Sequence, residues 1–450
     1  MSLIKKIKDY YKKNKTYLFT TPSHSQGNFI IPVLKEIIGK NYFKNDFSEI
    51  EGFDNLREPE GVIKKLLNDI SKIYDTKATF MLTNGSTSGI VAAMLAVLKT
   101  DDKVIIARNC HISVYNGLVL SGARPVWFLP EFDNNWGIYK GITGADIKKQ
   151  IAQNPDAKAL IITSPTYEGT FSEIEDIAKL CKKKNITLIV DEAHGALLNF
   201  GHFKVRPAIQ CGADISIQSL HKTAGAPNPC AVLHISKSSK ISAESIQQAL
   251  NLINTTSPSY PMMCAIEGTV KYLNSQKGKK HITKLFKIID DFKKTLPDSV
   301  EIYSNNNDIT KILLKIKGVN SFAVAELLNN KFNIEEEFST DEALLFITGI
   351  GTDSKKLKAL QKALKKISKM RIDKREDQST LSYSLPQMIY TPAEAYKKNK
   401  ITIDANNAEG KISAEAIVKY PPGIPVLLPG EVIDLNSMFS IEKSQITICE

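Results

Sequence analysis

The sequence contains no apolar run of the ~18–20 residues that a membrane-spanning helix requires. Its first residues, MSLIKKIKDYYKKNK, lack the apolar segment and the small-residue cleavage site of a secretory signal. Cysteine is scarce, with six in 450 residues, and no two of them form a CxxC pair or a regular spacing. The absence of such patterns argues against a disulfide framework and against a zinc site. We therefore expect the cysteines to be reduced thiols. We therefore expect a cytoplasmic protein without a metal site and without a membrane partner.

Nucleic-acid-binding motifs are also missing, although the chain is basic. It has 59 Lys and Arg against 48 Asp and Glu, which gives a formal net charge of +11. The lysines are scattered through helix-like stretches such as 182–184 and 355–366, without a recognition helix, a zinc finger or interleaved aromatic residues. We interpret the excess charge as a solvated lysine-rich surface and expect no nucleic-acid partner.

What the sequence does contain is the balance of a globular protein, with 42% hydrophobic and 24% charged residues. From about residue 61 to residue 275, short apolar runs rich in Ile, Val and Leu alternate with stretches of helical periodicity. The runs lie in KATFMLT, KVIIA, PVWFL, ALIITS, ITLIV, ADISIQS and CAVLHIS. Strands buried on both faces have this composition, and helices between them indicate βαβ units. The pattern predicts an α/β fold with a mainly parallel sheet.

The composition divides the chain into four parts. Residues 1–60 form an N-terminal segment with a basic helix candidate at Leu3–Lys15. Residues 61–275 form the large domain, and residues 276–370 form a small α+β domain with expected strands in KILLKIK and EALLFITG. Residues 371–450 comprise a linker within the charged stretch KMRIDKREDQST and a C-terminal subdomain marked by YPPGIPVLLPGE.

Open parallel sheets bind ligands beyond the carboxyl ends of their strands, so the polar residues that follow the apolar runs are the candidate site. Four clusters occur at such positions. They are Thr83–Gly89 (TNGSTSG), Asn109–Ser113 (NCHIS), Asp191–Gly195 (DEAHG) and Ser219–Thr223 (SLHKT). Each also has an ordinary structural explanation: a hydroxyl helix cap, a buried hydrogen-bonded His, a strand-end Asp that caps the next helix, or a surface lysine.

Each cluster also has a possible chemical role. In Thr83–Gly89, small residues let the backbone approach an anion, which hydroxyls and helix-start N–H groups can bind. The P-loop lysine and the GxGxxG spacing are absent, which disfavours nucleotides. Asp191 ends a buried strand and needs a cationic partner, such as a protonated ring nitrogen. At a buried strand end the pKa of Lys222 can be lowered, so that it forms a Schiff base with a carbonyl. His111 can stack on a flat ring or transfer a proton.

The order of the clusters matters more than any one of them. An anion loop, a strand-end Asp and a Lys one strand further on occur in sequence, at Ser86, Asp191 and Lys222. Pyridoxal phosphate (PLP) requires a cradle for its phosphate, a carboxylate that keeps its pyridine nitrogen protonated, and a lysine for its aldehyde. The combination predicts a PLP-dependent enzyme.

Over nearly the whole chain, these clusters resemble the Orn/Lys/Arg decarboxylase family of fold-type I PLP enzymes, whose large domain is like that of aspartate aminotransferase. The resemblance is to the short bacterial members, which lack an N-terminal receiver-like domain. The matching stretches are TTPSHSQG, GFDNLREPEG, TNGSTSG, NCHISVYNGLVLSGARPVW, ITSPTYEG, VDEAHGA, ADISIQSLHKT, TTSPSYPMM and ISAEAIVKYPPGIPVLLPGE. The resemblance implies decarboxylation of arginine, lysine or ornithine to the amine, with release of CO2, and a place in polyamine biosynthesis.

The resemblance also implies roles for single residues. Lys222 is the Schiff-base lysine, and Asp191 is the partner of the pyridine nitrogen. His111 stacks on the ring, while His194 lies beside the cofactor and near the substrate. Either Lys222 or His194 then returns a proton to the carbon that has lost CO2. The residues that hold the phosphate are Ser86, Thr87, Ser219 and His221, and Gly85 also belongs to the cofactor-binding residues.

Thr256 and Ser257 are implied to reach the neighbouring subunit's site, which makes a homodimer the smallest active unit. The chain also departs from the family pattern. Ile112 stands where the family usually has Lys, and Ser25 stands where the family often has Lys. The loop Ala224–Cys230, beside the cofactor, contains two prolines. The substrate therefore stays open. An aminotransferase, an aldolase, a decarboxylase of another amino acid and a catalytically silent PLP-fold protein are the alternatives.

A cationic substrate side chain needs an acidic partner. Candidates lie in the C-terminal part and in the small domain, and most are expected to be solvated surface carboxylates. They are Glu335, Glu336, Glu337, Glu394, Glu409, Glu415 and Glu431.

Overall fold

The computed structural model describes residues 2–13, 30, 32–50, 52–305, 308–370, 372, 384–419, 424–438, 441 and 443–450. Several stretches singled out in the sequence lie wholly or partly outside these residues: TTPSHSQG with Ser25, most of the charged linker, and the start of YPPGIPVLLPGE. No described helix is both long enough and apolar enough to cross a membrane.

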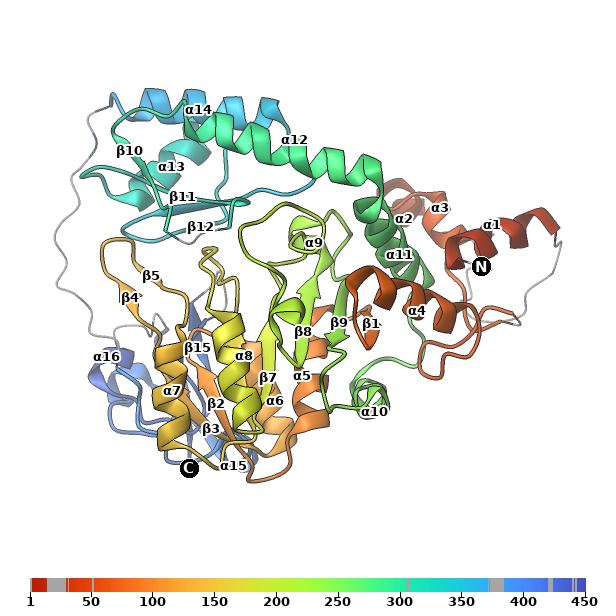
Figure 1. Ribbon diagram of the computed structural model, residues 1–450. Coiled ribbons are helices and arrows are strands. Elements are labelled where there is room, and N and C mark those ends of the chain that lie inside the picture. Colours follow the sequence, from red (N-terminus) through yellow and green to blue (C-terminus); the bar gives the residue numbers. More distant parts are fainter. Residues whose placement is uncertain are drawn as a thin grey trace.

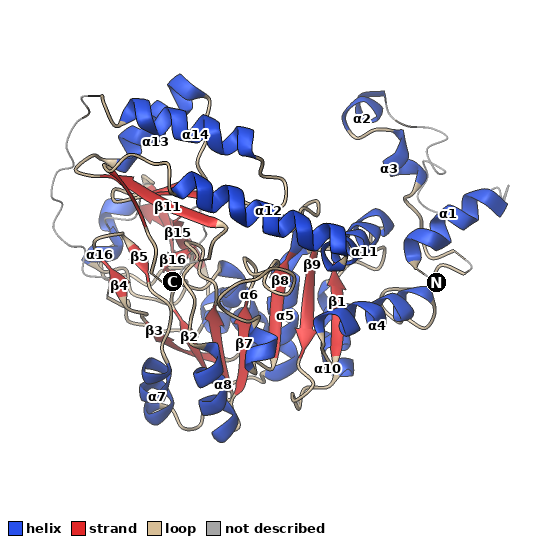
Figure 2. Cartoon of the chain, turned by 45° about the horizontal axis from the view of Figure 1, so that its top comes forward, coloured by secondary structure: helices blue, strands red, loops and turns tan. Residues whose placement is uncertain are grey.

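A seven-stranded, mainly parallel sheet forms the centre of the molecule, as the apolar runs predict (Figures 1 and 2). Its order is β1-β9-β8-β7-β6-β2-β3, and β9 is antiparallel to both neighbours. The strands are β1 (Ala78–Leu82), β2 (Lys103–Ala107), β3 (Arg124–Phe128), β6 (Ala159–Thr163), β7 (Thr187–Asp191), β8 (Ile215–Ser219) and β9 (Ala231–Ile235).

Helices cover both faces of this sheet, because successive strand residues point to opposite sides. Ile106 and Ile161 pack in the core under α5 (Gly85–Val97), α6 (Ile112–Ser121) and α10 (Ala243–Ile253). Ile105 and Leu160 pack in the core under α7 (Gly144–Gln153) and α8 (Ile174–Lys183). Short elements in the connecting loops are β4 (Phe132–Asp133), β5 (Ile138–Tyr139), a 3-10 helix at Ala208–Cys211 and α9 (Leu220–Thr223).

A second, smaller unit lies above the carboxyl ends of the large sheet (Figure 1). Its antiparallel sheet has the order β10-β11-β13-β12. Its elements are α12 (Gln276–Lys293), β10 (Val300–Ile302), β11 (Lys311–Ile316), α13 (Ser321–Phe332), β12 (Phe338–Ser339), β13 (Leu344–Ile347) and α14 (Ser354–Ile367). The sequence predicted β11 and β13 but missed β10 and β12, because two- and three-residue strands are too short to show periodicity.

The two ends of the chain pack on the large unit. The N-terminal elements are α1 (Leu3–Lys13), α2 (Pro32–Ile37), α3 (Lys40–Lys44) and α4 (Val62–Tyr74), and α1 contacts α4 and α11 (Tyr260–Asn274). The C-terminal elements are α15 (Pro392–Lys397), β14 (Lys400–Asp404), a 3-10 helix at Ala405–Asn407, β15 (Ile417–Lys419), β16 (Ile424–Leu427), α16 (Leu435–Met438) and β17 (Gln445–Cys449). This C-terminal part has its own small core around Leu427 and Ile446.

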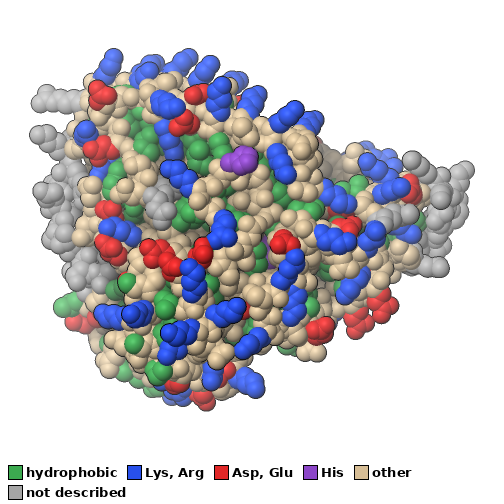
Figure 3. All heavy atoms as spheres, in the orientation of Figure 1, with side chains coloured by type: hydrophobic (Ala, Val, Ile, Leu, Met, Phe, Trp, Pro, Cys, Tyr) green, Lys and Arg blue, Asp and Glu red, His purple; other side chains and the backbone are tan. Residues whose placement is uncertain are grey.

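Basic side chains are spread over the visible surface (Figure 3). Many lie along its upper edge, where Figure 1 places α12 and α14. Acidic side chains are interspersed lower on the same face.

Candidate functional site

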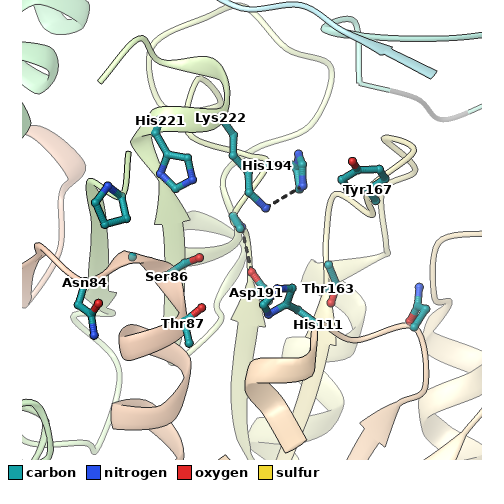
Figure 4. Close-up of a pocket in the computed structure, with 14 residues that line it drawn as sticks. Asn84, Ser86, Thr87, His111, Thr163, Tyr167, Asp191, His194, His221 and Lys222 are labelled. Carbon is teal, nitrogen blue, oxygen red and sulfur yellow. Dashed lines mark hydrogen bonds between the residues drawn. The ribbon is translucent and has the colours of Figure 1, made fainter. Parts of the chain in front are cut away.

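A cavity of about 240 Å³ lies at the carboxyl ends of β6, β7 and β8, where the strand-end rule places a ligand site (Figure 4). All four polar clusters contribute to it. The lining residues are Asn84, Gly85, Ser86, Thr87, Asn109, His111, Thr163, Tyr167, Asp191, Ala193, His194, His221, Lys222 and Pro229.

Eight of the predicted site residues therefore line a single cavity. Ser219 lies directly behind this wall, since its Oγ is 2.9 Å from Oγ of Ser86. Thr256 and Ser257 do not line the cavity: both are exposed, and the Ser257 hydroxyl lies 3.1 Å from Oγ1 of Thr255. The structure thus brings together every predicted residue except the two that were assigned to a neighbouring subunit.

One end of the cavity is suited to an anion. Helix α5 starts at Gly85, whose φ of +75° lies in the left-handed region that favours glycine. The N-cap Asn84 forms no side-chain cap hydrogen bond, so the ordinary cap explanation does not apply. The N–H groups of the first helical turn and the hydroxyls of Ser86 and Thr87 are therefore placed where a phosphate can bind.

The base of the cavity carries a buried carboxylate. Asp191 is the last residue of β7, and its Oδ1 accepts a hydrogen bond from the Ala193 N–H at 3.1 Å. None of the ion pairs between described residues involves Asp191. A buried carboxylate is costly unless it meets a positive charge, so this position calls for a cationic ligand group.

Lys222 and His194 meet at the middle of the cavity, with Nζ 3.0 Å from Nε2 (Figure 4). Burial lowers the pKa of Lys222, and nearby Asp191 opposes the shift. Burial and the charge of Lys222 lower the pKa of His194 well below its ordinary value, so its imidazole is neutral. An ammonium can only donate, so Nε2 of His194 accepts when Lys222 is protonated.

His111 is the N-cap of α6, and its Nδ1 accepts a hydrogen bond from the Ser113 N–H at 3.2 Å. This bond fixes the orientation of the ring at the cavity wall. Burial lowers the pKa of His111, while Asp191 opposes the shift. A neutral, oriented imidazole is suited to packing against a flat ligand ring.

Three buried polar atoms at the cavity have no hydrogen-bond partner among the described residues: Asn109 Oδ1, Thr163 Oγ1 and His194 Nδ1. Unpaired buried polar groups are rare in folded proteins and indicate a missing partner. Together with the anion end, the buried Asp191 and the cavity lysine, they fit a flat, phosphorylated pyridine aldehyde such as PLP.

Sequence reasoning missed two residues of the cavity wall, Thr163 and Tyr167. Both lie in the stretch ITSPTYEG, which follows β6. The strand-end rule would have included Thr163 had it been applied to this run. The place of Tyr167 depends on the course of the following loop, for which the sequence carries no signal.

A buried ion pair joins the C-terminal part to this site. The two terminal guanidinium nitrogens of Arg108, Nη1 and Nη2, each donate to a Glu431 carboxylate oxygen at 2.7 Å, and the side chains are only 4% and 2% exposed. Arg108 directly precedes Asn109 of the cavity wall and also stacks on Trp127. Glu431 is an exception to the expectation that most of these carboxylates lie on the surface. Its burial depends on tertiary packing.

Lys311 is a second buried cation near the site. Its side chain is fully buried, its Nζ has no hydrogen-bond partner among the described residues, and Oδ2 of Asp308 is 4.0 Å away. Burial lowers its pKa from 10.5 to about 8, and the charge of Lys222 adds to the effect. Lys311 also contributes to the low pKa of His194.

This burial predicts a pH-dependent stability. Between pH 8 and 10.5 the unfolded chain binds more protons at Lys311 than the folded chain does, so the free energy of unfolding rises with pH. Titration of Lys311 should add about 1 kcal/mol between pH 7 and pH 9. Urea unfolding should show that Lys311→Met loses this gain, whereas exposed Lys317→Met keeps it. An equal gain in both variants would contradict the assignment.

Comparison with known proteins agrees with the geometry. The family model described as "Orn/Lys/Arg decarboxylase, major domain" matches residues 2–313, and the corresponding C-terminal domain model matches residues 375–442. The arginine decarboxylase of Bacillus subtilis (strain 168) is 30% identical over 442 residues, covering 95% of this chain and 90% of its own length.

Solved structures show the same fold. The constitutive lysine decarboxylase of E. coli superposes with a TM-score of 0.83 at 19% identity, covering 100% of this chain and 82% of its own. A serine palmitoyltransferase from Sphingomonas wittichii superposes with a TM-score of 0.56 at 13% identity, covering 77% of this chain and 83% of its own.

Proposed function

Because the chain belongs to the Orn/Lys/Arg decarboxylase family, we propose that it decarboxylates a basic L-amino acid with PLP and releases the corresponding amine and CO2. Arginine, lysine and ornithine are the candidate substrates. Arginine is the first to test, because the Bacillus subtilis relative named arginine decarboxylase matches along nearly the whole length of both chains.

One observation carries this proposal: a buried carboxylate, a half-buried lysine and a helix start without a side-chain cap surround one cavity. Asp191 would hold the pyridine nitrogen and Lys222 the aldehyde carbon. Ser86 and Thr87, with Ser219 and the imidazole of His221, would hold the phosphate. When bound, PLP supplies an electron-withdrawing ring that stabilises the negative charge left on the substrate carbon when CO2 departs.

The remaining work falls to the protein's own side chains. Asp191 favours a protonated nitrogen because a buried carboxylate is stabilised by a positive partner. Burial lowers the pKa of Lys222, which makes the free amine, the nucleophilic form, more accessible near neutral pH. After CO2 has left, a proton must reach the substrate carbon. Lys222 and His194 are the candidate donors, since Nζ and Nε2 lie 3.0 Å apart at the cavity.

We also propose that the active unit is a homodimer in which Thr256 and Ser257 reach the partner's site. A second cavity of about 400 Å³ adjoins the candidate site and shares Asn84 and Thr87 with it. Leu120 and Tyr396 line this second cavity and are 58% and 62% exposed. A second copy of the chain would cover these side chains.

We propose a cytoplasmic location as well, which the six free thiols support.

The proposed function predicts CO2 release by the purified, PLP-loaded protein from at least one of arginine, lysine and ornithine. The measurement is release of labelled CO2 from each amino acid carrying the label in its carboxylate, in parallel reactions. Formation of a keto acid without CO2 would indicate an aminotransferase instead. An intact PLP absorbance with no turnover of any amino acid would favour a catalytically silent protein.

A further inference from the structure

We infer that Glu337, positioned by Tyr167, is the residue that recognises the distal cation of the basic substrate. The inference rests on the proposed function and names the acidic partner that this substrate class requires. A guanidinium or ammonium group at the end of the side chain is best bound by a carboxylate with a free oxygen.

Three of the six other acidic candidates are already engaged by the protein. Glu394 forms a capping box with Thr391, and Glu431 is held by Arg108. Glu415 accepts hydrogen bonds from the Thr447 N–H and from the Lys443 ammonium.

Asp191, Glu192 and Glu168 lie next to cavity residues in the sequence or line the cavity, but they are also poorly suited to this role. Glu192 is buried and accepts hydrogen bonds from the Gln218 amide and the Ala208 N–H. Asp191 faces the cavity but is assigned to the pyridine nitrogen. Burial raises the pKa of Glu168, which makes it a poor partner for a cation.

Glu337 occupies a different position. It directly precedes β12 in the small unit, and its N–H bonds to the carbonyl of Leu345 at 2.9 Å, which fixes its backbone. Its Oε1 accepts a hydrogen bond from the Tyr167 hydroxyl at 2.6 Å. Oε2 accepts no hydrogen bond from any described residue, and the side chain is exposed, so this oxygen is available to a ligand.

Tyr167 connects Glu337 to the reaction centre. It lines the cavity, and its ring meets that of His194 edge to face, with centroids 5.1 Å apart. Figure 4 shows Tyr167 beyond His194, on the side of Lys222 away from Ser86 and Thr87. Through Tyr167, Glu337 therefore adjoins the end of the cavity opposite the anion end.

The electrostatics agree with this placement. The negative charge of Glu337 favours the charged form of Lys222 and that of Lys311, and so opposes the effect of burial on the pKa of each lysine. A positive substrate group approaching from this side would meet the same favourable field.

The test compares arginine with citrulline, its uncharged isostere, by the ratio of their kcat/KM values in the PLP-loaded protein. If lysine or ornithine is the substrate, 2-aminoheptanoic acid or norleucine, respectively, serves instead, since each has a methyl group in place of the terminal ammonium. Glu337→Gln should lower the ratio roughly 10- to 100-fold, the range of a lost charged hydrogen bond, mainly by raising KM for the charged substrate. Glu337→Asp should recover part of the preference, and exposed Glu335→Gln should retain all of it.

The outcomes separate the inference from the proposed function. Turnover of none of the three basic amino acids by the parent protein would overturn the proposed function, and the inference with it. Turnover by the parent with an unchanged ratio in Glu337→Gln would overturn the inference alone. Equal loss of kcat for charged and uncharged substrates would also overturn it, since it would give Glu337 a general structural role. Thermal unfolding of each variant verifies that it is folded.

Discussion

Lys222→Ala is expected to reduce decarboxylation by roughly a thousandfold or more, because no other described residue lining the cavity has a primary amine to offer an aldehyde. The described residues that line the cavity include a single lysine, whose amine is held beside His194. The measurements are CO2 release and the visible absorbance of protein-bound PLP. Both should be lost while the protein stays folded.

The matched control is Lys182→Ala, which removes an exposed lysine from α8 and should leave both signals unchanged. Turnover near the parental rate in Lys222→Ala would refute the assignment of this lysine. Loss of turnover in both variants would indicate instead that the protein was inactivated during its preparation.

Arg108→Met is expected to lower the free energy of unfolding by about 3–5 kcal/mol, because it leaves the Glu431 carboxylate buried without its partner. The effect should extend to PLP affinity, since Arg108 adjoins Asn109 and its loss loosens the turn that carries His111. Urea unfolding measures the first effect, and PLP titration followed by absorbance measures the second.

Two comparisons isolate the contribution of the pair. The double variant Arg108→Met with Glu431→Met should recover most of the lost stability, because no charge is then left buried. Arg124→Met removes an exposed arginine that pairs with Asp101 on the surface and should change stability little. An equal effect of Arg108→Met and Arg124→Met would show that burial of the pair is unimportant.

The loop Ala224–Cys230, which departs from the family pattern, has a defined place in the structure. Pro229 lines the cavity beside Gly85, at the anion end. Gly225 packs against Ile350 of the small unit, whose N–H donates to the Thr223 carbonyl at 2.9 Å. The changes therefore affect the anion end of the cavity and the junction between units rather than the end near Tyr167 and Glu337.

The sequence by itself was sufficient to predict the α/β fold and most of the candidate site. Runs buried on both faces indicate parallel strands, and the carboxyl ends of parallel strands meet at one edge of the sheet. Asp191, Lys222 and Ser86 can therefore be grouped from the pattern of residues alone, since each follows such a run.

The tertiary structure alone decided the contacts that join distant parts of the chain. Tyr167 and Glu337 are 170 residues apart in sequence, and Arg108 and Glu431 are 323 apart. Lys311 belongs to a strand of the small unit, and only the packing of that unit on the large sheet makes it a buried cation. No local periodicity encodes such pairings, because they depend on how separately formed units pack together. The predicted site was thus identified from local sequence patterns. Glu337, the residue proposed to bind the distal cation of the substrate, was identified only from long-range packing.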